Sequence, residues 1–597
     1  MLPSYEDALK LYGAGEMAAA EEMLRPLDRD GQADAETLHL RGMALLRLDR
    51  AGEAAAVLER CYALSPSNNA VLVDLAEARD KTGDEDGAIP LLRTVNERVF
   101  GHSSSRILAQ LLVRKGRRLV ESGRHDEALA PLREAAEVNY TIPDALALLG
   151  LVLSRLGETI QAEQVLREAL RLYPGHAASM SNLAGVLDLL SRHREAEDLC
   201  LEVIGKFSPE IGATWCNLGS ARRNQGRTAE AKAAFETALA VEPALTEALV
   251  NLGQFHSIEG EPDKGAGLIR QALAIDPGNP AGNFIYACER LRAGDWQTGW
   301  DYYERRGGHF RTEKPWRGLA LLPSWPGGDP AGCRILLETE QGLGDSLHFF
   351  RYARLLADRG ATVGLVAQPP LVRLFSASDP RIAVMPSGHP IDPADWDFGI
   401  PLLSLPHRFG TRTETIPALL PCFTPVTADQ EAWRARLADL HGIKAGLVWA
   451  GGARPFDPIS NGIDGRRSMP LSALAPLAEL TGFDFVSLQK GPPAAQIAET
   501  PFPIWDWTEE LSDMADTAAL ITGLDLVVAV DTSVAHLAGG LGVPVLMLSR
   551  YDGCWRWLSG REGTPWYPGM RLFRQRRWAD WSAPVADLKT ALAGWKR

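Results

Sequence analysis

The chain has 597 residues, of which 46% are hydrophobic and 23% charged, so it is a folded protein too long for a single core. Its formal net charge of -14 argues against nucleic acid or an anionic membrane as the main partner, because either would require a basic face. No apolar run approaches the roughly 18–20 residues of a membrane span, and the N-terminal residues lack the apolar core of a signal peptide. The seven cysteines are scattered without metal-ligand spacing, so we expect a cytoplasmic protein with reduced thiols.

The first half of the chain repeats with a period close to 34 residues. One series of small residues recurs at steps of 35, 34, 34 and 34 residues: Gly150, Gly185, Gly219, Gly253 and Ala287. A second series keeps the same period: Ala128, Ala162, Ala196, Ala231 and Gly265. Small residues at two fixed offsets allow paired helices to pack closely, which is the signature of the tetratricopeptide repeat (TPR). We therefore predict an α-solenoid over residues 1–306, which presents a concave surface to another polypeptide.

Three asparagines, Asn182, Asn217 and Asn251, recur in register within the first helices of their repeats. In TPR arrays resembling this one, asparagines on the concave face can hydrogen-bond the backbone of a bound peptide. The sequence leaves two interpretations open, an acceptor-binding ladder and simple polar solvation. The last repeat ends in an aromatic segment, residues 295–306, which we interpret as a capping helix, and residues 307–330, rich in Gly and Pro, are predicted to be a linker.

From residue 331 onward, short apolar segments alternate with amphipathic ones. The strand candidates are residues 334–340, 361–367, 445–450, 483–488, 524–530 and 544–548. Alternating strands and helices predict parallel sheets covered by helices on both faces. A stretch near 411–443 separates two Rossmann-like α/β domains, residues 331–425 and 426–597, and a ligand is expected at the carboxyl ends of the strands.

A glycine-rich turn, residues 340–346, lies between a predicted strand and a predicted helix. Gly342 and Gly344 allow a ligand to approach the backbone closely, and the N–H groups at the start of the helix attract anions. Asp345 has two interpretations: a carboxylate that caps the helix and stabilises it by about 0.3–1 kcal/mol, or a general base that faces the crevice. The residues alone favour the cap.

A second turn, Asp531 to His536, follows a buried strand and opens an apolar helix. Thr532 and Ser533 are natural N-cap residues, and the same hydroxyls and free N–H groups suit a nucleotide phosphate. His536 either donates a hydrogen bond to a phosphate or ribose, or is an ordinary helix residue.

Cations follow other strands and loops of this half. Lys490 comes after a strand, and Arg466 and Arg467 lie in a glycine-rich loop. Each is either a cation that neutralises a leaving phosphate or a solvated side chain. Residues 395–397 have the DxD letters of metal-dependent sugar transferases, but they open an apolar segment and no other carboxylate cluster accompanies them. We interpret them as the entrance to a strand and expect no metal.

Six ordered segments of the second half resemble the TPR-fused bacterial glycosyltransferases, whose catalytic half is similar to the ADP-heptose glycosyltransferases of lipopolysaccharide assembly. They are residues 340–353, 446–452, 466–478, 485–491, 524–545 and 555–575. The resemblance implies a GT-B fold of two Rossmann-like domains, with the nucleotide sugar as co-substrate held mainly by the second domain and with no metal or further cofactor. It places the general base at Asp345 and the donor phosphates at Asp531 to His536, which reverses the preference for a simple cap.

The layout more narrowly resembles the soluble flagellin glycosyltransferases. In these proteins the TPR arm recruits flagellin and the GT-B half modifies its Ser and Thr residues; those closest in architecture use a CMP-activated nonulosonic acid such as pseudaminic acid. The leading hypothesis is therefore a protein O-glycosyltransferase. Asp345 would deprotonate the acceptor, while Lys490, an arginine of the 466–467 pair and the helix start at 532–533 would stabilise the departing phosphate. A lipid or glycan acceptor and a non-catalytic TPR scaffold are the alternatives.

Overall fold

The computed structural model describes residues 4–28, 31–99, 103–207, 209–306, 319–417, 420–452 and 458–596, without the side chains of 458–461. The chain forms two compact units, Met1–Val186 and Leu187–Arg597. The division falls within the helical repeats, and the predicted domain limits at residues 306, 330 and 425 stay predictions. Among the described helices, none is both long enough and apolar enough to span a bilayer.

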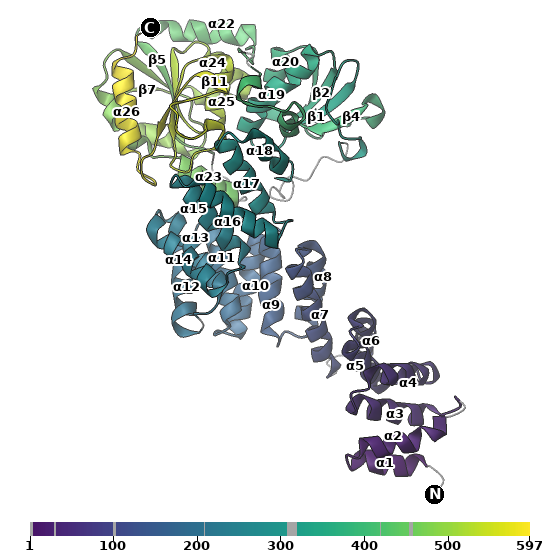
Figure 1. Ribbon diagram of the computed structural model, residues 1–597. Helices are drawn as coiled ribbons and strands as arrows, with labels where there is room; N and C mark the ends of the chain where they lie inside the picture. Colours follow the sequence, from purple (N-terminus) through teal and green to yellow (C-terminus); the bar gives the residue numbers. More distant parts are fainter. Residues whose placement is uncertain are drawn as a thin grey trace. The chain divides into compact units, whose positions relative to one another are not determined.

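The first unit consists of antiparallel helix pairs (Figure 1). Its helices are α1 (Tyr5–Gly13), α2 (Met17–Leu24), α3 (Ala35–Arg47), α4 (Ala51–Leu64), α5 (Asn69–Lys81), α6 (Glu85–Arg98), α7 (Ser104–Glu121), α8 (His125–Val138), α9 (Pro143–Arg155), α10 (Thr159–Leu172) and the beginning of α11 (Ala177–Leu189). Gly150 shows why the repeat requires a small residue, because a Cβ there would lie 2.4 Å from Cγ of Leu166 on the partner helix. The predicted TPR-type packing of helix pairs is confirmed.

The second unit begins with further helix pairs of the same kind. They are α12 (His193–Lys206), α13 (Gly212–Asn224), α14 (Thr228–Val241), α15 (Thr246–Ile258), α16 (Pro262–Ile275), α17 (Pro280–Arg292) and α18 (Trp296–Tyr303). In α13 a Cβ on Gly219 would lie 2.7 Å from the ring of Phe235 in α14, which repeats the geometry of the first unit. The helix pairs of the solenoid therefore continue as far as Tyr303.

A four-stranded parallel sheet follows, in the order β3-β2-β1-β4. Its strands are β1 (Arg334–Glu338), β2 (Thr362–Ala367), β3 (Ile382–Pro386) and β4 (Phe398–Pro401), and its helices are α19 (Leu343–Asp358), α20 (Pro369–Ser378) and α21 (Leu405–Arg408). Asp397 precedes β4, and its carboxylate accepts a hydrogen bond of 2.8 Å from the backbone N–H of Arg334. The interpretation of residues 395–397 as the entrance to a strand is thus confirmed.

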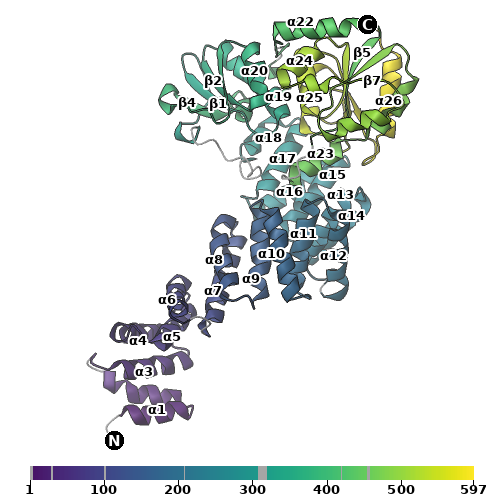
Figure 2. The same cartoon turned by 180° about the vertical axis from the view of Figure 1, so that it is seen from behind.

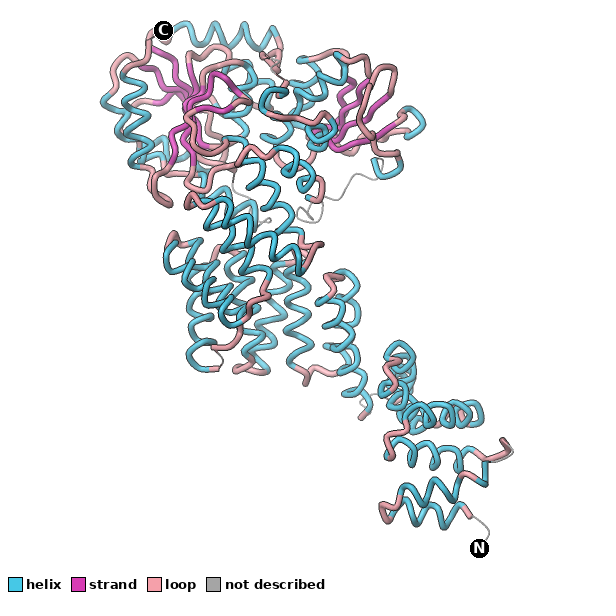
Figure 3. The backbone as a smooth tube through the Cα atoms, viewed as in Figure 1, coloured by secondary structure: helices cyan, strands magenta, loops and turns pink. Residues whose placement is uncertain are grey.

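A second, seven-stranded sheet has the order β10-β11-β9-β8-β5-β6-β7, with all neighbours parallel except β10 and β11. Its strands are β5 (Ile443–Val448), β6 (Phe483–Ser487), β7 (Ile504–Trp505), β8 (Leu526–Val530), β9 (Val545–Ser549), β10 (Gly563–Thr564) and β11 (Tyr567–Arg574). The helices beside it are α22 (Thr427–Arg436), α23 (Pro458–Arg467), α24 (Met514–Ile521), α25 (Ser533–Leu541) and α26 (Ser582–Ala593). Figures 2 and 3 show the strands in these two separate groups, so the predicted parallel sheets are confirmed.

The last helix of the repeats shares a core with the α/β part. Trp300 of α18 is 2% exposed, and its ring centroid lies 5.4 Å from that of Trp555, edge to face. The Trp300 indole N–H donates to the backbone carbonyl of Thr411 at 2.9 Å, and Trp296 packs against Trp566. The predicted capping helix therefore seals the repeats against the α/β part rather than against water.

The segment predicted to be a linker is partly packed. Residues 307–318 of this segment lie outside the described residues. After them Trp325 is 1% exposed, and its backbone N–H donates to the carbonyl of Gly399 in β4 at 3.3 Å. Arg408 donates to the carbonyl of Trp325 at 3.1 Å, so the second part of this segment runs along the edge of the first sheet.

Candidate active site

The two turns predicted to hold the nucleotide sugar lie against each other. The glycine-rich turn follows β1 and begins α19, and the Asp531 turn follows β8 and begins α25. A Cβ on Gly344 would lie 3.0 Å from Cδ2 of His536 and 3.5 Å from Cα of Ser533. Glycine at 344 thus permits the approach of the two helix starts. Because the N-terminus of a helix carries a partial positive charge, both starts favour an anion between or beside them.

Asp345 does what a capping residue does, and it also forms an ion pair. Its Oδ2 accepts a hydrogen bond of 3.1 Å from the backbone N–H of Gly342, and its Oδ1 accepts one of 2.5 Å from Nη2 of Arg556. The side chain remains 24% exposed. The cap that the residues alone favoured is present in the structure, and the role of general base implied by the resemblance stays a prediction.

Arg556 is a functional candidate that the sequence analysis did not single out. Its side chain is 7% exposed, and its guanidinium lies 4.4 Å from the centre of the Trp555 ring. Although burial opposes the charge, Asp345 helps to hold the pKa of Arg556 above its ordinary value, so the guanidinium is a permanent cation. The available signal was the Trp-Arg-Trp letters of residues 555–557, which belonged to a resembling segment but carried no assigned role.

The Asp531 turn is held by the same three-residue segment. Asp531 Oδ2 accepts a hydrogen bond of 3.0 Å from the indole N–H of Trp557. Thr532 occupies the N-cap position of α25, but its hydroxyl does not cap the helix, which corrects the simple capping interpretation. That hydroxyl is buried, and within the described part of the chain it has no hydrogen-bond partner. A buried hydroxyl beside free helix N–H groups suits a phosphate oxygen.

His536 is part of a buried aromatic cluster. Its ring stacks on Trp557 with the centroids 5.2 Å apart, and its Nδ1 lies 3.0 Å from the hydroxyl of Tyr567. Nδ1 of His348 in α19 lies 2.9 Å from the same hydroxyl. Burial lowers the pKa of His536 to about 4, so the imidazole is neutral near pH 7. The structure therefore places His536 in the packing between α19 and α25.

We expect the buried neutral imidazole of His536 to make stability depend on pH. The folded pKa lies below the ordinary value near 6.5, so this contribution is fully present above pH ~6.5 and is lost as the pH falls towards 4. Between pH 7 and pH 5 the loss is about 2 kcal/mol of unfolding free energy. Urea unfolding should show a smaller loss for His536→Gln than for the unaltered chain. The same loss in both would assign the dependence to other groups, including His348, whose pKa burial also lowers.

The predicted cations do not all meet at the Asp531 turn. Arg467 does, since its Nη1 donates to the backbone carbonyl of Asp531 at 2.8 Å, and it also pairs with Asp464. Lys490 is exposed, and its ammonium donates to the carbonyl of Leu511. The described contacts thus bring Arg467 to the turn, whereas Lys490 is bonded elsewhere.

The in-register asparagines connect neighbouring repeats. Asn182 donates to the carbonyl of Ala147 at 3.0 Å, and Asn251 lies 3.8 Å from Sγ of Cys216; each partner is 35 residues earlier in the chain. Asn251 also accepts a hydrogen bond of 2.7 Å from Arg223. Asn217 lies half-buried at the same repeat position. These amides have structural partners, and their role in binding an acceptor stays a prediction.

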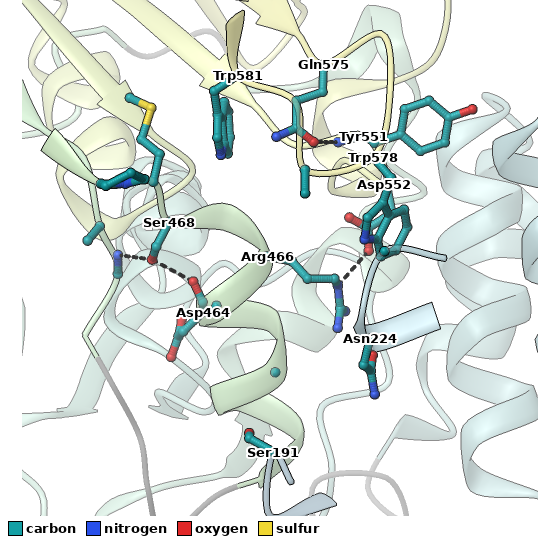
Figure 4. A pocket seen from close by; sticks show the side chains of 18 of the residues that line it. Ser191, Asn224, Asp464, Arg466, Ser468, Tyr551, Asp552, Gln575, Trp578 and Trp581 are labelled. Carbon is teal, nitrogen blue, oxygen red and sulfur yellow. Dashed lines mark hydrogen bonds and ion pairs between the residues drawn. The ribbon is translucent and has the colours of Figure 1, made fainter. Parts of the chain in front are cut away.

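A cavity of about 660 Å³ lies at the carboxyl ends of several strands of the second sheet, beside the turns of two repeats. Figure 4 shows Trp581, Gln575 and Arg466 around it, with Arg466 bonded to Asp552 at a distance of 3.1 Å. Helix α23 ends with two arginines that face different partners: Arg466 lies in the wall of this cavity, and Arg467 lies on the Asp531 turn. The sequence analysis considered Arg466 but did not predict the cavity, because its walls come from segments far apart in the chain.

Within the described ranges, no group of three or more His, Cys, Asp or Glu side chains is arranged to hold a metal ion. All seven cysteines are free thiols.

Comparison with known proteins defines the class of the first half. Sequence models of the tetratricopeptide repeat match residues 45–115, 113–176, 148–210 and 216–280. Tetratricopeptide repeats are therefore present across residues 45–280, in agreement with the 34-residue period and the helix pairs.

Individual proteins resemble this chain over very different lengths. The chain is 27% identical to Protein FlbA of Caulobacter vibrioides over 452 residues, which are 70% of this chain and 73% of that protein. It is 30% identical to human tetratricopeptide repeat protein 7B over 135 residues, 23% of this chain and 16% of the relative. It is 31% identical to the type IV pilus assembly protein PilF of Pseudomonas aeruginosa over 121 residues, 20% of this chain and 48% of the relative. The likeness to FlbA thus covers far more of the chain than the likeness to the other two.

Among solved structures, MamA of Desulfovibrio magneticus RS-1 aligns with 29% of this chain and 96% of its own length, at 21% identity and a TM-score of 0.22. A double mutant of the same protein aligns similarly, over 28% of this chain and 94% of its own.

Proposed function

We propose that the chain is a protein O-glycosyltransferase that moves a sugar from a nucleotide sugar to Ser or Thr of a protein held by the TPR arm. The observation that supports this most directly is the meeting of the glycine-rich turn and the Asp531 turn, which places Asp345 and two helix starts together. The resemblance of both turns to GT-B enzymes assigns them to the base and to the donor phosphates. The GT-B fold also fits the two parallel sheets, because these turns lie at the ends of their strands.

The phosphate of the donor would lie at the start of α25. There the free N–H groups, the unpartnered hydroxyl of Thr532 and the guanidinium of Arg467 supply hydrogen-bond donors and positive charge. Such fixed donors stabilise the negative charge that develops as a nucleotide leaves, because they need no reorganisation during the reaction.

In the proposed reaction the acceptor hydroxyl oxygen attacks the anomeric carbon of the donor sugar. The bond between that carbon and the phosphate oxygen breaks, and the nucleotide departs with the electron pair. The hydroxyl proton passes to the carboxylate of Asp345, whose exposed fraction gives it access to an acceptor. Arg556 would keep this carboxylate in place through its ion pair.

The nature of the acceptor is inferred from the repeats. TPR arrays build surfaces for polypeptides, and a small lipid or glycan would give so many repeats no use. Flagellin is the acceptor that the resemblance favours, with a CMP-activated nonulosonic acid as donor and the cytoplasm as the location.

An intact-mass assay tests this function. The full-length protein is mixed with flagellin and other candidate acceptors and supplied in parallel with CMP-, UDP-, GDP- and ADP-sugars. A mass increment equal to one or more glycosyl units identifies donor and acceptor together. No increment with any donor, together with no thermal shift from any sugar nucleotide, would favour the second candidate, a TPR scaffold. That candidate has its own support, because capping and ion pairing already account for Asp345 without catalysis.

Truncation should separate a protein acceptor from a lipid or glycan acceptor. Removal of residues 1–300 is unsuitable, because Trp300 and its neighbours belong to the core of the second unit. Removal of residues 1–176, which ends before α11, spares that core. We expect transfer to protein to fall at least tenfold, a loss of about 1.4 kcal/mol or more of acceptor binding, while nucleotide binding stays unchanged. Undiminished transfer to protein would show that residues 1–176 do not hold the acceptor, whereas loss of transfer to protein with retained transfer to a lipid or glycan would point to a small acceptor.

A further inference from the structure

A second cavity adjoins the one at the carboxyl ends of the second sheet. Its volume is about 350 Å³. Both cavities are bounded by the same five residues, which are Gly226, Arg466, Tyr551, Asp552 and Trp578. We call the two together the repeat-edge groove. The two cavities are therefore adjacent, and an elongated ligand that passes their shared residues would contact both.

The groove follows the repeats in order. Ser191 and Gln225 line the first cavity and Glu259 lines the second. These residues are 34 apart, so they occupy the same position in three successive repeats. A ligand along the groove therefore meets an equivalent position of one repeat after another, which is the arrangement expected for an extended chain rather than for a compact small molecule.

The first cavity is lined by uncharged polar side chains such as Ser468 and Gln575, by aromatic ones such as Trp581, and by three charged ones, Asp464, Arg466 and Asp552. Gln575 is 6% exposed, and its Oε1 accepts a hydrogen bond of 3.0 Å from the backbone N–H of Tyr551. Its Nε2 is buried and has no hydrogen-bond partner in the described part of the chain. An unused buried donor carries a free-energy cost unless a ligand acceptor satisfies it, and a peptide carbonyl or a Ser or Thr hydroxyl would do so.

The second cavity has a surplus of positive charge. Its lining contains four arginines, Arg223, Arg466, Arg576 and Arg577, and two carboxylates, Asp552 and Glu259. Of these carboxylates, Asp552 already pairs with Arg466 at 3.1 Å, and Glu259 pairs with Lys232 at 2.6 Å. Arg576 pairs with Asp587 at 2.7 Å, so the surplus rests on Arg223 and Arg577. Arg577 is exposed. A ligand with a carboxylate at this end would be attracted, whereas an ammonium would be repelled.

We propose that the repeat-edge groove binds an extended segment of the acceptor polypeptide, with uncharged hydroxyl-bearing residues in the first cavity and an acidic residue in the second. The proposal rests on the proposed function. It connects that function to the candidate active site through α23, where Arg466 lines the groove and the next residue, Arg467, contacts the Asp531 turn. The groove and the predicted donor site are thus contacted by adjacent residues of one helix.

Peptide binding to the full-length protein tests this inference. The probes are short peptides of Gly, Ser and Thr that end in two aspartates, two asparagines or two lysines, labelled with a neutral dye at the other end. We expect fluorescence anisotropy to show about tenfold tighter binding of the aspartate peptide than of the lysine peptide. Equal affinities, or no binding of any probe, would overturn the inference.

Three variants assign the binding to the groove. Arg577→Glu should abolish or invert the preference for the aspartate peptide, because the charge at that end is reversed. Arg571→Glu is the matched control. Arg571 lies in β11, earlier in the chain than Arg577; its side chain is 52% exposed and lies outside both linings. It should keep the preference. Gln575→Met removes the amide donor without adding a charge, and it should weaken all three peptides alike. A preference that survives Arg577→Glu would contradict the assignment.

The outcomes also separate this inference from the proposed function. Expected peptide binding without transfer of any sugar in the mass assay would support the groove and count against the enzyme. The opposite outcome is that sugar is transferred to a protein while Arg577→Glu changes neither the transfer yield nor the peptide preference. That result would support the enzyme and overturn the groove.

Discussion

Replacement of Asp345 by Asn is expected to lower the rate of glycosyl transfer by about 10²–10⁴-fold, the usual contribution of a general base. Nucleotide affinity should remain within a few-fold, because the groups proposed to bind phosphate lie at the other helix start. The rates come from the intact-mass assay, and the affinities from calorimetric titration with the donor nucleotide. Full activity in this variant would remove Asp345 from the reaction.

The ion pair with Arg556 requires a control for this prediction. Asn leaves the buried guanidinium of Arg556 without its carboxylate, which destabilises the fold independently of catalysis. The double variant Asp345→Asn, Arg556→Met removes both charges and should recover much of the lost stability. If transfer stays absent while stability returns, and Arg556→Met alone retains transfer, the carboxylate acts in the chemistry. If transfer returns together with stability, Asp345 is a structural residue.

Replacement of Trp300 by Ala is expected to lower the free energy of unfolding by about 3–5 kcal/mol, as for other large aromatic side chains removed from cores. The side chain is 2% exposed, and its loss also leaves the carbonyl of Thr411 without a donor. Since Trp300 belongs to a repeat helix but packs on Trp555, the last repeats and the second sheet should be destabilised together. Calorimetry combined with hydrogen exchange over residues 280–306 and 555–567 measures both effects.

Trp505→Ala provides the comparison for that experiment. This indole is 44% exposed on β7 and should cost far less on removal. If Trp300→Ala loosened only the repeats and left the second sheet protected, the shared core would not be a cooperative unit.

The repeats and several strands could be predicted because their signals are local. A small residue recurs every 34 positions where two helices meet, and central strands such as β8 are continuous apolar runs buried along their whole length. The strands β3, β7 and β10 and the long strand β11 were missed. β3 is a short apolar segment at the edge of its sheet, where only Ile382 is fully buried. β11 mixes buried and exposed residues without a regular period, and β7 and β10 have two residues each, so none of these three gives a continuous apolar run of strand length.

The candidate site was predicted in part for a similar reason. Glycines and N-cap residues after strands identify Gly344 and Thr532 locally, and the structure brings their two turns together. Arg556 was not identified as a partner of Asp345, because the two are 211 residues apart and no local pattern pairs them. The position of Lys490 also depends on tertiary structure, since the carbonyl that it contacts comes from a later loop.

The Trp-Arg-Trp turn at residues 555–557 couples the positions of the two candidate loops. Arg556 of this short turn binds Asp345 and Trp557 binds Asp531, so acidic groups that follow strands of two different sheets are held by two adjacent residues. The spacing between the group assigned to the acceptor and the group assigned to the donor is then fixed by two adjacent residues. A ligand that displaced residues 555–557 would shift both loops at once, and neither loop could adjust to its own substrate alone.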